Sequence, residues 1–509
     1  MDVTQILMLI TILVYLAAMV GIGAVLAKQN QTTDDFYLGG RTLGPLVTAM
    51  SAEASDMSSW LLMGLPGVAY LSGTADAAWT AIGLAIGTYV NWLVVAKRLR
   101  NYTHVCGNST TLPLFFSNRY RDNKRILSVI AALLIIIFFV PYTASGFAAC
   151  GKLFANLFGM DYLPAMLISA IVIVAYTTLG GFLAASTTDF VQSIVMTIAI
   201  VVVFGFGISK VGSFSAVMDN AKSMAGYFSL THTHNAAAGT ASPYSLLQIF
   251  STLAWGLGYF GMPHVLLRFM AIGDANKLKL SRRVATVWVV ISMAVSVFIG
   301  VIGNAMTKAG VLPTLKDPET IILVVSDLIS KHGVLATIIA GLILAGILAA
   351  TMSTADSQLL AASSSASQNI LKEVFMKDMS EKTGMLIARI TVLVIALIGV
   401  FIARNPDSSV FQIVSFAWAG FGASFGPLVL LALFWKRSTF QGALCGMISG
   451  GVMVFVWKFL IRPMGGALGI YELLPAFLLG LAVNVIVSLL TPAPSREVQD
   501  EFDKVASMK

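Results

Sequence analysis

The clearest shortage in this sequence is of charged side chains. Only 11% of its 509 residues are Asp, Glu, Lys or Arg, whereas 57% are hydrophobic. A soluble domain carries about 25% charged residues, so the composition excludes an ordinary soluble protein. It predicts an all-α polytopic membrane protein, built as a single transmembrane domain over residues 1–509.

Cysteine, histidine and catalytic motifs are also scarce. The chain has three cysteines and five histidines. Cys106, Cys150 and Cys445 share no metal-binding or redox spacing, and we expect His232 and His234 to be solvated in a loop. No Walker, GxSxG or HExxH motif is present. Nothing therefore predicts an enzyme, ATP hydrolysis or a cofactor other than a coupling ion.

Long apolar runs take up most of the chain, and about 20 such residues suffice to span a bilayer. The first run, 3–27, is too long for a signal peptide and lacks a basic segment before it, so we expect it to remain as a helix. The sequence predicts about thirteen transmembrane helices, at 3–27, 43–71, 75–96, 126–151, 162–183, 189–209, 244–270, 284–307, 334–370, 384–403, 409–435, 440–461 and 471–491.

Basic residues are distributed unevenly between the two sides of this predicted topology. Of the 32 Lys and Arg residues, 23 fall on the side that carries the C-terminal tail, 492–509, and 9 on the other. Cytoplasmic loops carry the excess of basic residues, so we expect the N-terminus outside and the C-terminus in the cytoplasm. This bias accounts for the net charge of +8 without nucleic-acid binding.

Span 2 contains an unusually polar stretch, residues 51–60. It holds Glu53, Asp56 and four serines inside an otherwise apolar run. One charged side chain at the centre of a spanning helix costs about 2.5–3.5 kcal/mol on insertion scales. Gly64 and Pro66 follow and weaken the helix further. We expect a break in this span that lines a cavity.

Span 7 shows a second unfavourable stretch, residues 255–264. It contains three glycines, a proline and three aromatic residues, a composition that predicts either an unwound, aromatic-lined segment or close packing. Two interrupted spans five helices apart indicate an inverted repeat with a site near the midplane. The repeats are predicted at 43–209 and 244–435, with 3–27 and 440–491 as additional helices.

Oxygen ligands for a cation can be assigned from these interruptions. Unwound backbone offers the carbonyls of Ala54 and Met57. On span 9, Ala350, Ser353 and Thr354 share one helix face. A set with little net charge suits Na⁺ better than Mg²⁺ or Ca²⁺. Two alternatives remain: a proton carried on a carboxylate of span 2, or hydroxyls that only bond back to their own helix.

Aromatic residues near the same depth predict a pocket for a small solute. Trp60, Tyr142, Trp255 and Tyr259 would enclose its apolar part, although Tyr142, beside Pro141, is equally consistent with helix packing. Freed N–H groups at a half-helix suit a carboxylate on that solute.

Five stretches together resemble the sodium:solute symporter family: residues 38–41, 55–58, 255–264, 352–354 and 417–422. The resemblance covers about Val14 to Pro494 and is closest to proline-transporting members. It implies a ten-helix inverted-repeat core in a bacterial inner membrane. It also implies secondary active transport by alternating access, in which Na⁺ drives the uptake of L-proline.

The resemblance also implies roles for individual residues. It assigns Na⁺ binding or coupling to Ala54, Asp56, Met57, Ser58, Ala350, Ser353 and Thr354. It assigns the solute site to Ser55, Trp60, Tyr142, Trp255, Tyr259, Phe260, Gly261 and Pro263. Arg41 and Asp189 are implied in coupling or gating, whereas their own sequence context also fits a basic loop anchor and a helix cap.

Four positions depart from the family pattern. Glu53 and Ser59 stand where glycine is familiar, Met262 where glutamine is, and Asp356 where serine is. The alternatives are a Na⁺- or H⁺-coupled symporter of another small solute, such as pantothenate, a betaine or a monocarboxylate. A channel or a sensor is a further alternative, but there is no repeated pore loop and the short tail holds no kinase domain.

Overall fold

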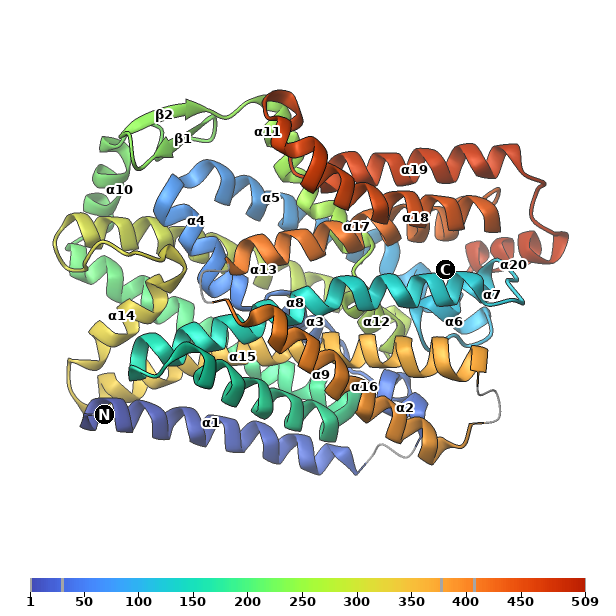
Figure 1. Ribbon diagram of the computed structural model, residues 1–509, viewed down its shortest axis with the longest axis horizontal. Coiled ribbons are helices and arrows are strands. Elements are labelled where there is room, and N and C mark those ends of the chain that lie inside the picture. Colours follow the sequence, from blue (N-terminus) through green and yellow to red (C-terminus); the bar gives the residue numbers. More distant parts are fainter. Residues whose placement is uncertain (1, 29–31, 376–378, 406–408, 509) are drawn as a thin grey trace.

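The computed structural model describes residues 2–28, 32–375, 379–405 and 409–508. Most of its helices run along the long axis of the molecule (Figure 1). Ten helices in these ranges are long and apolar enough to cross a membrane, and three apolar helices are shorter, at Trp60–Ser72, Tyr162–Ala175 and Leu246–Phe260. The three short helices fall in predicted spans 2, 5 and 7, so the interruptions expected in spans 2 and 7 are present.

The first half of the chain begins with α1 (Val3–Ala27), which packs on α9 and α15. The elements that follow are α2 (Thr33–Leu38), η1 (Gly39–Arg41), α3 (Pro45–Asp56), η2 (Trp60–Gly64), α4 (Leu65–Ser72), α5 (Thr74–Val90), η3 (Asn91–Val95), α6 (Ala96–Val105), α7 (Leu112–Arg119), α8 (Ile126–Phe158), α9 (Tyr162–Val211) and α10 (Phe214–Ser223).

The second half begins with a hairpin of two antiparallel strands, β1 (His232–Asn235) and β2 (Thr240–Pro243). It continues with α11 (Leu246–Leu253), η4 (Ala254–Phe260), α12 (Pro263–Ala271), η5 (Ala275–Lys277), α13 (Leu278–Lys308), η6 (Pro318–Thr320), α14 (Ile321–Ser330), α15 (Val334–Ser364), η7 (Ser365–Phe375), α16 (Glu381–Ala403), α17 (Val410–Phe434), α18 (Phe440–Val456), η8 (Trp457–Ile461), η9 (Arg462–Met464), η10 (Gly466–Leu468), α19 (Leu473–Leu490) and α20 (Arg496–Ser507).

Helix α9 joins predicted spans 5 and 6 without a loop. Its only non-helical residue is Gly181, with φ of 63° and ψ of −174°, a backbone conformation that glycine adopts readily. Asp189 therefore lies eight residues inside the second half of α9. The interpretation of Asp189 as a helix cap is wrong, because no helix begins there.

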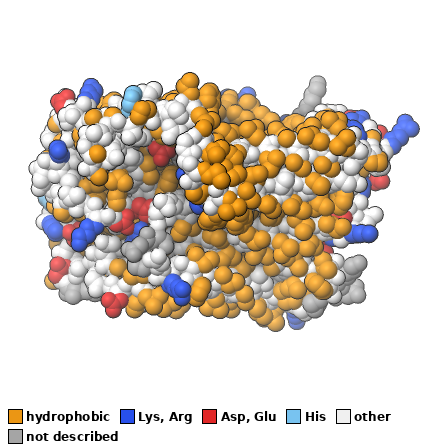
Figure 2. Space-filling model, turned by 45° about the horizontal axis from the view of Figure 1, so that its top comes forward, with side chains coloured by type: hydrophobic (Ala, Val, Ile, Leu, Met, Phe, Trp, Pro, Cys, Tyr) orange, Lys and Arg blue, Asp and Glu red, His pale blue; other side chains and the backbone are white. Residues whose placement is uncertain are grey.

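A broad apolar surface covers much of the molecule. Figure 2 shows hydrophobic side chains covering much of one face, with charged side chains gathered toward the two ends. The exposed large apolar side chains of the molecule include Ile171, 67% exposed, and Leu397, 69% exposed. An apolar surface of this kind is stable only in contact with lipid, so the chain is a multi-pass membrane protein.

The interrupted helices lie in the centre of the fold. Helix α3 packs on α9, α12, α13 and α15, and η4 packs on α5 and α17. A Cβ added at Gly87 would lie 2.5 Å from Gly256 Cα, so glycine at these positions lets α5 and η4 approach backbone to backbone. This close packing holds η4, the break of span 7, against α5.

The predicted tail forms helix α20, at the opposite end of the molecule from the β-hairpin (Figure 1). Its residues Val498, Phe502 and Val505 are buried against α6. Arg121 forms ion pairs of 3.0 Å with Glu497 and 2.8 Å with Glu501. The tail is thus a docked amphipathic helix.

Candidate functional site

The break in span 2 follows directly from the backbone of α3. Its last helical residue is Asp56, and Met57 has φ of −81° and ψ of 70°. The amide of Ser58 turns back to the Asp56 carbonyl at 2.9 Å, so the Ala54 carbonyl loses the donor it would have in a continuous helix. The chain resumes at Trp60 as the π-helix η2.

Helix α15 supplies the missing donor to the Ala54 carbonyl. Ser353 Oγ donates to Ala54 O at 2.8 Å and lies 3.2 Å from Ala350 O, and Thr354 Oγ1 donates to Ala350 O at 3.1 Å. Four of the five predicted cation ligands thus meet between α3 and α15, and Met57 is buried at the adjoining break. They form a compact, uncharged set of oxygens.

Asp56 connects this oxygen set to the predicted solute residues. Its carbonyl accepts from Trp60 Nε1 at 3.2 Å and from the Tyr142 hydroxyl at 3.1 Å. Its carboxylate oxygen Oδ2 accepts from the Tyr259 hydroxyl at 2.6 Å. Its other oxygen, Oδ1, is buried and has no hydrogen-bond partner. One residue therefore joins α3, α8 and η4.

A layer of aromatic rings covers the site on the side of the β-hairpin. The Trp255 ring stacks on Tyr471 with 5.0 Å between ring centroids. Its centroid lies 5.5 Å from that of Phe411 and 6.1 Å from that of Trp60. Trp255 and Tyr471 line a cavity of about 190 Å³. A second cavity of about 800 Å³ adjoins it through four shared residues, Asp76, Phe411, Ser415 and Arg462.

The remaining predicted solute residues are more scattered. Phe260 lines a separate cavity beside α5, and Gly261 packs so closely on α17 that an added Cβ would lie 2.7 Å from the Gly426 amide. Pro263 is buried at the first position of α12. Ser55 Oγ bonds to its own helix, and Ser58 Oγ accepts from the Trp60 amide at 3.4 Å. Of the predicted solute residues, Trp60, Tyr142 and Tyr259 are the ones that bond to Asp56.

Arg268 is a central residue that the sequence analysis missed. Its guanidinium donates to Asp189 Oδ2 at 3.2 Å, to Ser51 Oγ at 3.0 Å, to Ser357 Oγ at 2.5 Å and to the His264 carbonyl at 2.9 Å. The Arg268 and Asp189 side chains are 1% and 0% exposed. Arg268 lies inside predicted span 7, and the position of a basic residue within an apolar run is a signal of a buried role.

Asp356, one of the four departures from the family pattern, belongs to the same cluster. Its Oδ1 accepts from Ser357 Oγ at 3.1 Å, and its Oδ2 is buried without a hydrogen-bond partner. Asp356 is also within electrostatic reach of Arg268. Arg268 thus faces two carboxylates, one from α9 and one from α15, directly beside the cation ligands of α15.

Comparison with known proteins identifies the family. A family model described as the sodium:solute symporter family matches residues 36–450. The chain belongs to this family. A sodium/proline symporter of Salmonella typhimurium is 41% identical over 502 residues, with 98% of this chain and 96% of the relative covered. A high-affinity proline transporter of Bacillus subtilis is 42% identical over 482 residues, covering 95% and 98%.

Solved structures of symporters show the same fold. A Na⁺-coupled sialic acid symporter in a substrate-bound, outward-open state aligns with a TM-score of 0.78 at 19% identity. The alignment covers 96% of this chain and 99% of that one. The resemblance predicted from sequence motifs is therefore confirmed for the family and for the inverted-repeat fold class.

Arg41 cross-links neighbouring segments of this sodium:solute symporter family member at the end that carries α20. It donates to the Met270 carbonyl at 2.6 Å, to the Ser109 carbonyl at 2.7 Å and to Asn108 Oδ1 at 3.1 Å. The Leu43 amide bonds to the Ala271 carbonyl at 3.2 Å. Burial and nearby Arg100 lower the pKa of Arg41 to about 10, so it stays charged at neutral pH. These contacts tie α3 to α12.

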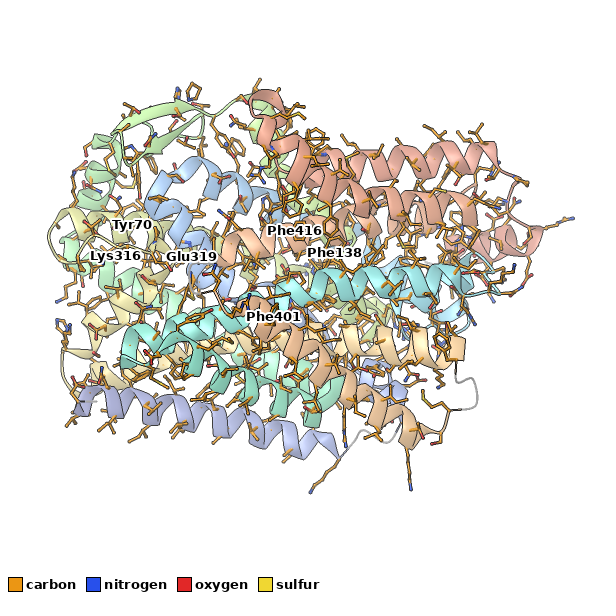
Figure 3. The ribbon with its side chains drawn as sticks, viewed as in Figure 1. Tyr70, Phe138, Lys316, Glu319, Phe401 and Phe416 are labelled. Carbon is orange, nitrogen blue, oxygen red and sulfur yellow. The ribbon has the colours of Figure 1, made fainter. Side chains whose placement is uncertain are left out.

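An ion-pair cluster at the other end of this family member joins α8 to α17. Lys152 Nζ lies 3.0 Å from Glu319 and 2.8 Å from Asp317. Glu319 also accepts from Ser409 Oγ and from the Val410 amide at the start of α17, where a negative charge suits the helix dipole. Figure 3 shows Glu319 and Lys316 toward the end where Tyr70 lies, with Phe416 and Phe138 nearer the middle.

Proposed function

We propose that this chain is a secondary active transporter that couples Na⁺ entry to the uptake of L-proline by alternating access. The observation that carries the proposal is the contact between the Ser353 hydroxyl and the Ala54 carbonyl, 2.8 Å. It joins the broken helix to an intact one through oxygens that suit Na⁺. Relatives about 40% identical over nearly their whole length bear the name sodium/proline symporter.

We assign Na⁺ to the oxygens of Ala54, Met57, Ala350, Ser353 and Thr354. The hydroxyls of Ser353 and Thr354 donate to the carbonyls of Ala54 and Ala350, so these oxygens already lie close together. Na⁺ would replace these hydrogen bonds with ion contacts and fix α3 against α15. Asp56 and Ser58 lie beside this set and supply charge compensation and local order.

We assign L-proline to the junction of the broken α3, α8 and η4, next to the cavity that Trp255 lines. Trp60, Tyr142, Trp255 and Tyr259 surround it with apolar surface and two hydroxyls, which suits a small cyclic amino acid. Because Tyr259 holds the Asp56 carboxylate at 2.6 Å, proline binding at Tyr259 would act directly on the residue beside the ion.

Coupling then follows from thermodynamic linkage. If Na⁺ tightens proline binding by ordering the break, proline must tighten Na⁺ binding by the same factor. One Na⁺ that enters down about 100 mV contributes about 2.3 kcal/mol. That energy supports roughly fifty-fold accumulation of a zwitterion, since about 1.4 kcal/mol corresponds to tenfold.

The two ends of the site act as alternating gates in this proposal. Residues 43–209 and 244–435 form the two repeats, with the N-terminus outside and the C-terminus in the cytoplasm, as the distribution of basic residues supports. The cavity beside Trp255 then faces outside, with the aromatic layer as its floor. Arg41 and the Arg268–Asp189 pair keep the cytoplasmic side closed, and both must rearrange for release.

Uptake of radiolabelled proline into proteoliposomes tests this function. We expect rapid accumulation with an inward Na⁺ gradient and little with K⁺ at the same membrane potential. Uptake that ignores Na⁺ and follows a proton gradient would remove the Na⁺ assignment. Normal Na⁺-driven uptake of pantothenate, betaine or a monocarboxylate, without proline uptake, would remove the substrate assignment only.

A further inference from the structure

An apolar cavity of about 230 Å³ lies between α1, α8, α9 and α15. Among the fifteen described residues that line it, Ser169 alone carries an oxygen or nitrogen in its side chain. The Ser169 hydroxyl donates to the Ala165 carbonyl of its own helix at 2.9 Å. Water finds no hydrogen-bond partners in such a cavity, so the cavity excludes water and suits an apolar occupant.

The cavity is long and narrow, and it runs along the helices. Its walls extend from Leu9 to Leu16 on α1 and from Ala165 to Ile173 on α9, which correspond to about 10 and about 12 Å of helix length. A volume of about 230 Å³ over that length leaves a cross-section of about 20 Å². This space accommodates one extended hydrocarbon chain, and it does not admit a second chain beside the first.

The mouth of the cavity lies on the apolar surface that contacts lipid. Leu13 of α1 and Ile168 of α9 line the cavity, and each is 53% exposed. Toward the N-terminus of α1, Gln5 Nε2 donates to the Leu157 carbonyl at 2.8 Å and links α1 to α8. Figure 1 shows α1 at the edge of the helix bundle, beside α9 and α15. The hydrocarbon of the bilayer therefore reaches this mouth directly.

The inner wall of the cavity is helix α15, which carries proposed Na⁺ ligands. Leu348 and Met352 line the cavity and are 4% and 1% exposed. Met352 directly precedes Ser353, whose hydroxyl donates to the Ala54 carbonyl at 2.8 Å. One turn of α15 thus meets the cavity through Met352 and the break after α3 through Ser353.

We propose that this cavity binds one acyl chain of a membrane phospholipid, which braces α15 against α3. The chain gives the lining side chains the dispersion contacts that a void would deny them. A phospholipid is the occupant because its chains are the medium at the mouth of the cavity, and because the cavity offers no partner to a polar group. A filled cavity resists displacement of α15 away from α3, so the chain favours the arrangement in which Ser353 and Ala54 are in contact.

The site makes the phospholipid an effector of the ion site. Binding of the chain requires only the cavity, whereas its effect on Na⁺ rests on the proposed Na⁺-coupled function. A chain that favours the ion-binding arrangement tightens Na⁺ binding, and Na⁺ tightens the binding of the chain by the same factor.

Photo-crosslinking tests whether a chain occupies the cavity. The protein is reconstituted with phosphatidylglycerol that carries a diazirine near the end of one acyl chain, and adducts are mapped by mass spectrometry. We expect adducts on Met352, which is 1% exposed and out of reach of the lipid around the protein. Ala165→Phe places a ring in the cavity and should abolish these adducts. Ile171→Phe adds a ring on the lipid-facing side of α9, where Ile171 is 67% exposed, and should leave them unchanged.

A second pair of variants keeps the test decisive if Ala165→Phe does not fold. Leu13→Trp adds a large ring at the mouth, whereas Val14→Trp adds it at the next position of α1, which is 64% exposed and outside the cavity. Leu13→Trp should reduce the Met352 adducts, and Val14→Trp should not. The site is overturned by adducts confined to exposed residues in the unaltered protein, or by Met352 adducts that neither Ala165→Phe nor Leu13→Trp reduces.

Binding of ²²Na⁺ to the purified protein in detergent tests the effect on the ion. We expect removal of bound phospholipid to raise the Kd of Na⁺ about fivefold or more, and added phosphatidylglycerol to restore it. In Ala165→Phe the ring replaces the chain, so the Kd should not depend on phospholipid. An unaltered protein with the same Kd in both conditions would overturn the bracing of α15. Absence of Na⁺ binding in both conditions would instead reject the proposed function, and the Met352 adducts would still report the chain.

Discussion

Asp56 shows how one residue can serve two ligands. Its carbonyl and carboxylate together accept hydrogen bonds from three aromatic side chains on three elements, yet one of its oxygens is left free. The neighbouring oxygens of Ala54 and Ser353 bond to each other. An ion that enters between them exchanges hydrogen bonds for ion contacts, and Asp56 transmits this change to the aromatic residues.

Ser353→Ala should weaken Na⁺ more than proline. The variant removes one proposed ligand and the 2.8 Å bond to Ala54, but no contact with the aromatic residues. We expect the Na⁺ concentration for half-maximal uptake to rise about tenfold or more, the effect of losing about 1.4 kcal/mol. Uptake kinetics at saturating proline measure this shift. Ser365→Ala, at the start of η7, is the control. An unchanged Na⁺ requirement would remove Ser353 from the ion site.

The Arg268–Asp189 pair should be strongly coupled. Removing one partner of a buried ion pair costs about 3–5 kcal/mol, because the other charge is left uncompensated. We expect Arg268→Gln and Asp189→Asn each to lower the thermal unfolding midpoint in detergent. The double variant should be more stable than the sum of the single effects predicts. Additive losses would show that the two side chains act independently.

The sequence offered more signals for the proposed ion ligands than for the buried ion pairs. Ser353 and Thr354 were identifiable because hydroxyls on one face of an apolar helix are unusual there, and Ala54 because it precedes a break. The pairing of Arg268 could not be identified in this way, because Asp189 is 79 positions away on another helix. No local pattern specifies such a pairing. Glu53 was noticed as a departure, but its contact with Trp92 required the fold.

At the scale of elements, two helices at the centre of the fold end early. Helix α3 stops at Asp56 and α11 gives way to η4 at Ala254. Both breaks are held by neighbouring helices, α15 for the break after α3 and α17 for η4. Segments with few helical hydrogen bonds of their own open at low free energy, so these breaks are the natural hinges.

Arg41→Ala should loosen the closed end between α3, α6 and α12. Arg41 donates to Asn108 and to the Ser109 carbonyl. Cys106 lies in the same segment, and its backbone carbonyl accepts from Ser109 Oγ at 2.6 Å. Cys106 is buried, so its alkylation reports opening. We expect membrane-permeant maleimide to label Cys106 about tenfold faster in Arg41→Ala, which corresponds to about 1.4 kcal/mol of lost closure.

Cys150 serves as the internal control for this labelling. It is also buried, but it lies on α8, away from Arg41. Peptide mapping by mass spectrometry separates the two sites. Equal acceleration at Cys150 would indicate general unfolding, and no acceleration at Cys106 would contradict a closing role for Arg41.

Most elements could be predicted from the apolar runs, whereas their ends could not. Each predicted span contains a helix, and the short helices fall in spans 2, 5 and 7. The helical connection at 184–188 was missed because small and hydroxyl residues such as Ser186 resemble a loop in sequence. In the fold these residues are part of the continuous helix α9. Likewise, the tail was predicted only as cytoplasmic, because the partner surface for Phe502 is formed by α6 and α7.

For the whole molecule, the central claim is that one compartment holds both the ion and the solute. The breaks of the two halves meet there, with contacts of Arg41 closing one side and aromatic rings covering the other. A shared compartment makes each ligand a stabiliser of the other, whereas two unrelated sites would bind independently.

Equilibrium binding of radiolabelled proline to the purified protein, titrated with Na⁺ at constant ionic strength, tests this claim most directly. We predict that saturating Na⁺ lowers the Kd of proline at least about tenfold relative to K⁺, a coupling of about 1.4 kcal/mol or more. Proline should lower the Kd of Na⁺ by the same factor. A proline Kd that is identical in Na⁺ and K⁺ would contradict the account.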